Sequence, residues 1–161
     1  MNRYDDEEMG LDIESMRSDI KYPNIKPPNN INKILEEVSN LEILRKLDPM
    51  SVMEYASIVA YYSLYLSGEI NKLEAYAKWC ESNIKFIIGK RCQDINGYFT
   101  EKESYIRAHD ELASSLDEKR IKAQTKFETL KFMNQKMQFL SETLQSLAKE
   151  KSYTRKINEY N

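Results

Sequence analysis

Apolar side chains recur every seven residues along the last third of the chain, from Leu116 to Leu144. A second apolar row, offset from the first by three residues, contains Met133, Leu140 and Leu147. Two such rows form the a and d seam of one long helix, a pattern typical of a coiled coil or a helical bundle. The first row consists of Leu116, Ala123, Leu130, Met137 and Leu144.

Shorter periodic segments precede this helix. Residues 31–47 show helical apolar spacing, and Asp48 followed by Pro49 is a strong signal for the start of a new helix. From Pro49 to Leu66 nearly every face is apolar, so this helix must be buried in a core or between subunits. Ser67 and Gly68 mark a kink or a helix end, after which the pattern resumes to residue 88.

The region between the apolar segments contains turn signals. Asn96 and Gly97 predict a turn, and Thr100 to Glu103 is a candidate capping box for a further helix. Residues 100–117 are charged and weakly periodic, so we expect a helix or a helix and loop that leads into the long seam helix, which ends near Ala148. Phe132 and Phe139 lie beside the seam and are expected to widen its apolar face, which favours a multi-helix bundle.

Composition supports an all-α fold, an elongated helical bundle with a long coiled-coil-like C-terminal helix. The chain has only four Gly and four Pro, and three of the four Pro precede residue 30. Residues 1–30 are expected to form a disordered acidic arm, because up to Tyr22 seven acidic residues face three basic ones, a net charge of −4. Residues 31–161 then form the helical oligomerisation and DNA-binding domain.

Three roles are open for the arm. It can be a plain solvated tail, or a regulatory segment that competes with nucleic acid for a nearby basic site. It can also be a docking peptide, because apolar residues are interspersed among its acids. These apolar residues are Met9, Leu11, Ile13 and Met16.

Charge distinguishes the long helix from the rest of the chain. From Glu118 to Ile157 there are ten Lys or Arg and four acidic residues, a net of +6. An associating helix with a positive surface suits a multimer that binds a polyanion, because lysine and arginine neutralise phosphates regardless of sequence. Aromatic side chains, onto which single-stranded bases could stack, lie near the basic residues that end the preceding helix. These aromatic residues are Tyr98, Phe99 and Tyr105.

The sequence contains no pattern that indicates a catalytic site or a metal-binding site. Only one histidine, His109, is present, and Cys80 and Cys92 are expected to be reduced thiols, so neither a triad nor a metal site is predicted. No phosphate-binding glycine motif occurs, and we expect a non-enzymatic protein without cofactors. The acidic N-terminus argues against a signal peptide, and the uncharged run from Tyr55 to Gly68 is too short to span a membrane, so a cytoplasmic protein without membrane contact is expected.

Over residues 56–157 the chain resembles the UvsY recombination mediator proteins of T-even-like tailed phages. Members of that family have a tyrosine-rich helix, comparable with Ala56 to Trp79. A basic helix end then runs into an Asp–aromatic–Gly turn, comparable with Gly89 to Tyr98. The last element is a long amphipathic helix with a basic end, similar to residues 130–157.

The resemblance implies a helical protein that assembles into a ring. Such proteins bind single-stranded DNA and help the phage recombinase displace the single-strand-binding protein. The basic pair implicated in DNA binding would be Lys90 and Arg91, with Lys85 nearby. In this chain the pair is adjacent, so the two side chains point about 100° apart on a helix.

Together these observations predict a recombination mediator that binds single-stranded DNA as a homo-oligomer. Two other functions stay open: a helical scaffold that binds only protein, and an inhibitor whose acidic arm mimics DNA. The predicted DNA-binding residues are Lys85, Lys90, Arg91, Lys119, Arg120 and Lys122. The predicted oligomerisation residues are Tyr62, Trp79, Leu130, Met133, Met137, Leu140, Leu144 and Leu147.

Overall fold

The structure, a computed structural model, describes residues 26–160, with side chains described up to Ile157. Every regular element in this range is helical, which confirms the all-α prediction. The elements are α2 (Ile31–Ser39), α3 (Leu41–Lys46), α4 (Pro49–Arg91), the short 3-10 helix η1 (Cys92–Asp94), α5 (Phe99–His109) and α6 (Glu111–Tyr160). Most of the predicted acidic arm, residues 1–25, lies outside the described residues.

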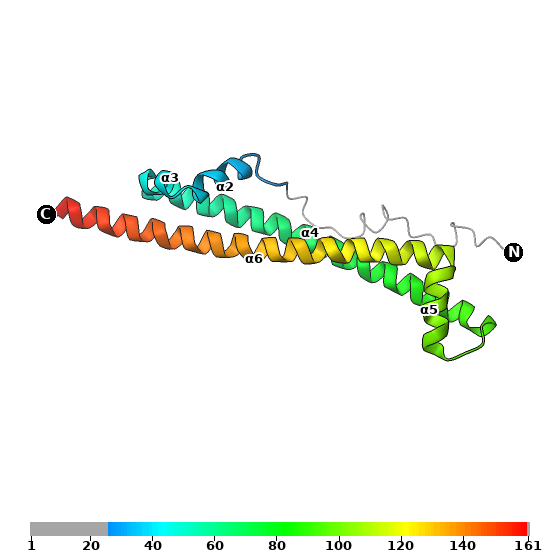
Figure 1. Cartoon of the computed structure of the whole chain (residues 1–161). Coiled ribbons are helices and arrows are strands. Elements are labelled where there is room, and N and C mark those ends of the chain that lie inside the picture. The colour runs from blue at the N-terminus through cyan, green and yellow to red at the C-terminus, as the bar shows by residue number, and fades with distance from the viewer. Residues whose placement is uncertain (1–25, 161) are drawn as a thin grey trace.

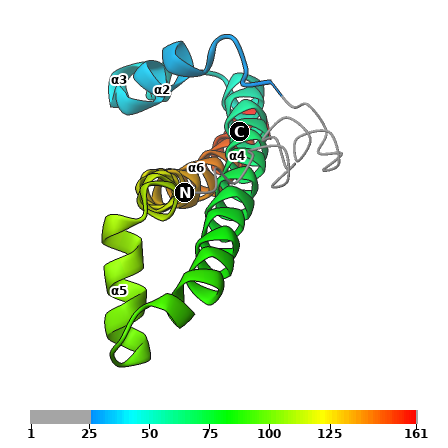
Figure 2. The ribbon, with the colours of Figure 1, turned by 90° about the vertical axis from the view of Figure 1, so that its right-hand side faces the viewer.

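Two long helices dominate the molecule. The 43-residue α4 and the 50-residue α6 lie side by side and antiparallel, which makes the bundle elongated (Figure 1). The short helices α2 and α3 lie on one side of this pair, near the start of α4, whereas α5 lies on the other side, at the opposite end (Figure 2). No helix in the described part of the chain is both long and apolar enough to cross a membrane.

The α4–α6 contact uses one of the two predicted rows on α6. Leu116, Ala123 and Leu144 of the first row are buried, as predicted. The second contacting row is not Met133, Leu140 and Leu147, but the row that precedes each of the first-row residues by three positions. It consists of Ala113, Arg120, Phe127, Asn134, Ser141 and Ala148.

Small side chains explain this correction. Ala113, Ser141 and Ala148 are at most 4% exposed, and the Ser141 hydroxyl donates to the Ala56 carbonyl oxygen at 2.9 Å. A side chain can reach the backbone of the opposite helix only when the two helices approach closely, which leucine or methionine at these positions would prevent. A mixed row with several small and polar side chains therefore forms part of the interface, which a search for large apolar residues at heptad spacing misses.

A polar layer fixes the register at mid-length. The Asn134 side chain accepts a hydrogen bond from the Ser63 hydroxyl at 2.6 Å and donates one to the Ser67 hydroxyl at 3.1 Å. An asparagine in a coiled-coil seam favours one register, because any shift leaves its amide without these partners. The same pairing explains why α4 continues through Gly68, because Ser63 and Ser67 hold the preceding turn of α4 on α6 through Asn134.

The structure corrects the expected position of two phenylalanines. Phe132 and Phe139 are 60% and 72% exposed, so they point away from α4 rather than widening the seam. They lie one heptad apart on the outer face of α6, and Tyr153 continues the same row at 69% exposure. Within the described part of the chain this row is an exposed aromatic surface.

Helix boundaries follow from local caps. Residues 31–47 are not one helix, because the Asn40 side chain accepts from the Glu42 and Ile43 amides and starts α3 afresh. Asp48 caps α4 as predicted, accepting from the Met50 and Ser51 amides at 2.9 and 3.1 Å.

At the far end of the pair the structure confirms one predicted feature, the turn at Gly97, and corrects two others, the cap of α5 and the end of α6. Gly97 has φ +126°, a conformation that suits glycine, and so makes the predicted turn. The capping contact that opens α5 is made by Glu101, whose carboxylate accepts from the Tyr98 amide, and not by the Thr100 to Glu103 pair. Asp110 separates α5 from α6, and α6 continues beyond Ala148 to Tyr160.

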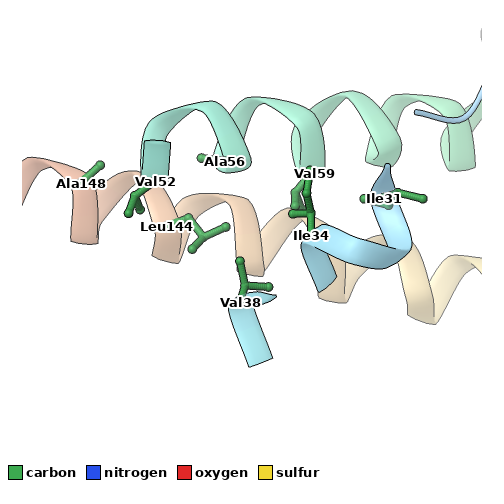
Figure 3. Packing of buried hydrophobic residues seen from close by; sticks show 8 residues of the cluster. All are labelled: Ile31, Ile34, Val38, Val52, Ala56, Val59, Leu144 and Ala148. Carbon is green, nitrogen blue, oxygen red and sulfur yellow. The ribbon is translucent and has the colours of Figure 1, made fainter. Parts of the chain in front are cut away.

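Two apolar clusters lie at opposite ends of the pair. One joins α2 to both long helices, with Ile34, Val59 and Leu144 at its centre (Figure 3). The other joins α4 to α5 and the start of α6, with Ile84, Ile106 and Leu116 buried. Tyr55 of α4 also donates a hydrogen bond to Glu37 of α2, which ties that helix to one edge of α4.

Lys151 holds the end of α3. Its ammonium group donates to the carbonyl oxygens of Leu44, Arg45 and Leu47 at 2.9, 2.9 and 2.6 Å. These are carbonyl groups that the helix end leaves without helical partners. The lysine therefore fastens α3 to α6 by capping.

We expect Lys151→Ala to lower the free energy of unfolding by about 1–3 kcal/mol, because three carbonyls lose a charged donor. Lys149→Ala, which removes an exposed lysine from the same helix, is the control and should change it by less than about 0.5 kcal/mol. Urea unfolding monitored by circular dichroism measures both. Equal effects of the two substitutions would contradict a capping role for Lys151.

Candidate nucleic-acid interface

The antiparallel pairing brings all six predicted DNA-binding residues to one end of the molecule. The last turns of α4, which contain Lys85, Lys90 and Arg91, lie beside the first turns of α6. The Arg120 side chain of α6 is 3.4 Å from the Glu81 carboxylate of α4, which shows how close the two helices are there. Chain folding therefore gathers residues that are about thirty positions apart in sequence.

An ion-pair cluster occupies one edge of this end, where α5 packs. The Arg107 guanidinium of α5 contacts the carboxylates of Glu81, Glu103 and Asp117 at 2.9, 3.0 and 3.1 Å. The hydrogen bonds that Arg107 donates to Glu81, which outweigh the opposing effect of burial, raise the pKa of Arg107 above its usual range. Arg120 joins the cluster through Asp117 at 2.9 Å.

Three of the six predicted residues belong to this structural edge. Lys85 lies 3.8 Å from Glu81, and Arg120 is held within the cluster. Arg91 contacts Asp110 at 3.3 Å, and the same carboxylate caps α6 by accepting from the Leu112 and Ala113 amides. These three side chains contact acidic residues of their own chain, as Lys122 also contacts Glu118, so the six predicted residues differ in their surroundings.

The opposite edge of α4 has a second heptad stripe that sequence reasoning missed. Beside the seam, residues at alternating spacings of three and four form a largely aromatic row along the whole helix. The signal was present as tyrosines at fixed helical spacing, but the dense apolar run around them concealed it. The row consists of Tyr55, Ile58, Tyr62, Tyr65, Glu69, Lys72, Tyr76, Trp79, Asn83, Phe86 and Lys90, and its aromatic run is interrupted by Asn83 and by the Glu69–Lys72 ion pair.

The matching edge of α6 changes character along its length. Next to Tyr55 and Tyr62 it presents Leu140 and Leu147, which pack in the cluster covered by α2. Beyond α2 the same edge becomes basic, with lysines at helical spacing. These lysines are Lys119, Lys122, Lys126 and Lys136.

The edge beyond α2 therefore combines aromatic and cationic side chains. The register in which Ser63 pairs with Asn134 and Ala56 with Ser141 places Trp79 level with Lys119. No described helix packs over this stretch, because α2 ends its contact near Tyr62 and α5 lies on the other edge (Figures 1 and 2). We call it the basic aromatic face; it consists of Tyr76, Trp79, Phe86, Lys90, Lys119, Lys122 and Lys126.

Local contacts order this face. The rings of Tyr76 and Trp79 stack with centroids 5.9 Å apart and planes at 12°, and the Lys90 ammonium lies 4.4 Å from the Phe86 ring centre. Phe86 is 53% exposed, whereas the indole N–H of Trp79 is buried without a hydrogen-bond partner among the described residues. Lys122 pairs only with the exposed Glu118, a weak contact that a phosphate can replace.

The thiols and the histidine form no reactive site. Burial raises the pKa of the Cys80 thiol, opposed by its contact with Tyr76 and the charges of Lys119 and Arg120, so the reactive thiolate is disfavoured. His109 stacks on Tyr105 at 4.2 Å. Among the described residues no group of three His, Cys, Asp or Glu side chains could hold a metal ion.

The predicted oligomerisation residues are largely used within one chain. Leu144 is buried in the α2 cluster, and Tyr62, Met137, Leu140 and Leu147 pack against it. Trp79 packs against the cluster at the other end, while Leu130 and Met133 are half-buried along the pair. Apart from Leu144 these side chains are half-buried in one chain, and the row of Phe132, Phe139 and Tyr153 is a more exposed surface.

Comparison with known proteins finds no matching family model, no matching curated protein and no matching solved structure.

We expect Arg107→Met to lower the free energy of unfolding by about 2 kcal/mol, because three half-buried carboxylates would lose their common partner. Lys85→Met is the matched control at the edge of the same cluster, where the exposed 3.8 Å contact should be worth less than about 0.5 kcal/mol. Thermal and urea unfolding at low ionic strength measure the difference. A loss below about 0.5 kcal/mol for Arg107→Met would contradict a stabilising role for the cluster.

Proposed function

We propose that this protein is a non-enzymatic accessory protein of recombination that binds single-stranded DNA without sequence preference through the basic aromatic face. The observation that supports it is the change along one edge of the α4–α6 pair. Where α2 covers the edge, α6 contributes leucines, and where no described helix covers it, α6 contributes Lys119, Lys122 and Lys126. Lysines opposite exposed aromatic rings are the combination that single strands require.

The binding mode follows from these side chains. The lysines neutralise successive phosphates, which releases counterions and makes affinity fall steeply with salt. Phe86 and the stacked Tyr76–Trp79 pair offer ring faces to unstacked bases, and stacking is indifferent to base identity. The acidic residues Glu81, Glu103 and Asp117 lie on the opposite edge, already paired with arginines, so they do not repel the strand.

The wider role rests on the resemblance to UvsY-type mediators. On that basis the partners are a recombinase and a single-strand-binding protein, and the place of action is the cytoplasm, of a host cell if the gene belongs to a phage. Lys90 would keep the DNA contact that the resemblance implies. Arg91, in contact with Asp110, would contribute mainly to the fold.

Assembly is part of the proposal. A single face, about 20 Å long from Tyr76 to Lys90 by helix rise, contacts few nucleotides, whereas repeated copies would line up a longer track. The exposed aromatic row on the outer face of α6 is our candidate contact between copies, because its heptad spacing suits pairing with another helix. A helical scaffold that binds only protein would use the same row, but the lysines of the basic aromatic face would then have no ligand.

Binding to a labelled single-stranded oligonucleotide across a salt series tests the function. We expect the triple variant Lys119→Gln, Lys122→Gln and Lys126→Gln to weaken binding at low salt at least tenfold. It should also reduce the slope of log affinity against log salt by about 2, at about 0.7 for each lost phosphate contact. The matched control replaces three lysines that lie away from this face: Lys78, Lys131 and Lys149.

Two results would count against this function. Absence of binding by the folded wild-type protein at low salt would leave the protein-only scaffold as the better explanation. Equal weakening by the test and control triples would show diffuse charge attraction rather than a defined face. Quenching of Trp79, the only tryptophan of the chain, by bound strand gives an independent signal from the face itself.

Sedimentation of the purified protein tests the assembly. We expect an oligomer, and we expect Phe139→Ser together with Phe132→Ser to shift the mass toward the monomer while the helical circular dichroism signal is retained, because both side chains are exposed in one chain. The control Tyr61→Ser removes an exposed aromatic from α4 instead. A monomeric wild type, or an unchanged mass in the double variant, would overturn this contact.

A further inference from the structure

We infer that the acidic N-terminal segment of this chain, residues 1–25, docks on the basic aromatic face and competes there with the DNA strand. The inference rests on the proposed function for its consequence, but the contact itself is argued independently. Four observations carry it: the direction of α2, the length of chain before it, the charge of that chain and the incomplete burial of the face.

The direction of α2 shows from which point on the molecule the preceding chain extends. This helix runs antiparallel to α4, so its first residue, Ile31, lies toward the middle of the long pair and Val38 lies toward its end (Figure 3). The preceding chain therefore starts at the boundary where coverage by α2 stops. It starts on the same edge as the face, because Tyr62 of the aromatic stripe packs in the cluster that contains Ile31.

Length is sufficient. The uncovered stretch from Tyr65 to Phe86 is ~32 Å long by helix rise. The 25 residues before Lys26 can span up to ~80 Å when extended. Even a chain that is far from fully extended reaches Trp79, and the tether keeps its local concentration in the millimolar range.

Charge and apolar pattern are complementary. Up to Tyr22 the segment has a net charge of −4, and its acids Asp5 to Glu8 precede the apolar residues Met9, Leu11 and Ile13. The face has the opposite sign, with Lys119, Lys122 and Lys126 along one border. Acidic side chains can pair with these lysines while the apolar ones lie on the rings, which is the same chemistry that a nucleic-acid strand would use.

The exposed parts of two aromatic side chains indicate where on the face the arm would make contact. Tyr76 and Trp79 are only half-buried by the described residues, although their stacked rings already pack on the cluster around Cys80. The Trp79 indole N–H is enclosed but has no acceptor there. The parts of the two rings that stay exposed are where the apolar residues of the arm would pack.

The experiment uses the full-length chain and two readouts. Acrylamide quenching of Trp79 fluorescence reports whether the face is covered, and titration with a single-stranded oligonucleotide reports affinity. The arm-neutral variant has the substitutions Asp5→Asn, Asp6→Asn, Glu7→Gln and Glu8→Gln. The matched control replaces four exposed acids of the helices by glutamine: Glu36, Glu54, Glu128 and Glu142.

We expect the arm-neutral variant to raise the quenching constant of Trp79 about twofold and to bind the strand about tenfold more tightly, whereas the control changes neither. The Lys119, Lys122 and Lys126 triple variant, without DNA, should raise quenching in the same way, because the arm loses its partner. Salt should raise quenching in wild type but not in the arm-neutral protein.

The outcomes separate this inference from the proposed function. If no form binds DNA but arm neutralisation and the lysine triple both expose Trp79, the docking inference stands and the DNA proposal falls. If wild type binds DNA and arm neutralisation changes neither readout, docking is overturned alone. Tighter DNA binding without any change in Trp79 quenching would overturn the contact too, because the arm would then act only through long-range charge.

Discussion

The close approach of α4 and α6 is the constraint on which the rest of the structure depends. Ala113, Ser141 and Ala148 bring the two backbones near enough for the Ser141 hydroxyl to bond the Ala56 carbonyl oxygen. Asn134 then fixes the register through Ser63 and Ser67. Once this register is set, every residue on the two edges has a defined neighbour, so the positions of both the ion-pair cluster and the basic aromatic face follow from it.

The two edges of the pair differ in the side chains that they present. On one edge, α5 is joined to both long helices by Arg107, which satisfies three carboxylates at once. On the other edge, α2 covers the apolar half of a stripe whose remaining half is aromatic and flanked by lysines. Acidic residues that are already paired with arginines within the fold do not repel a polyanionic ligand. Lysines in weak, exposed ion pairs can exchange their carboxylate partner for a phosphate.

A long two-helix pair also explains why the chain retains exposed aromatic surface. Two helices bury only the stripes that face one another, and α2, α3 and α5 are too short to cover all the remaining sides. Phe132, Phe139 and Phe86 stay exposed in one chain as a result. Such residues suit contacts with a further copy, with bases or with another segment of the same chain, and these three possibilities are the basis of our proposals.

The sequence by itself determined the helical class, the Asp48 cap, the turn at Gly97 and one row of the long seam, because these depend on local spacing and local hydrogen bonds. It could not determine the second seam row, since alanine and serine at an interface look unremarkable until a partner helix approaches. Nor could it separate Lys119 and Lys122, which border the aromatic face, from Arg91 and Arg120, which contact acidic residues of other elements. Only the tertiary structure decided which basic residues meet acidic residues from other elements and which border an aromatic face, because those neighbours come from distant helices brought together by one antiparallel register.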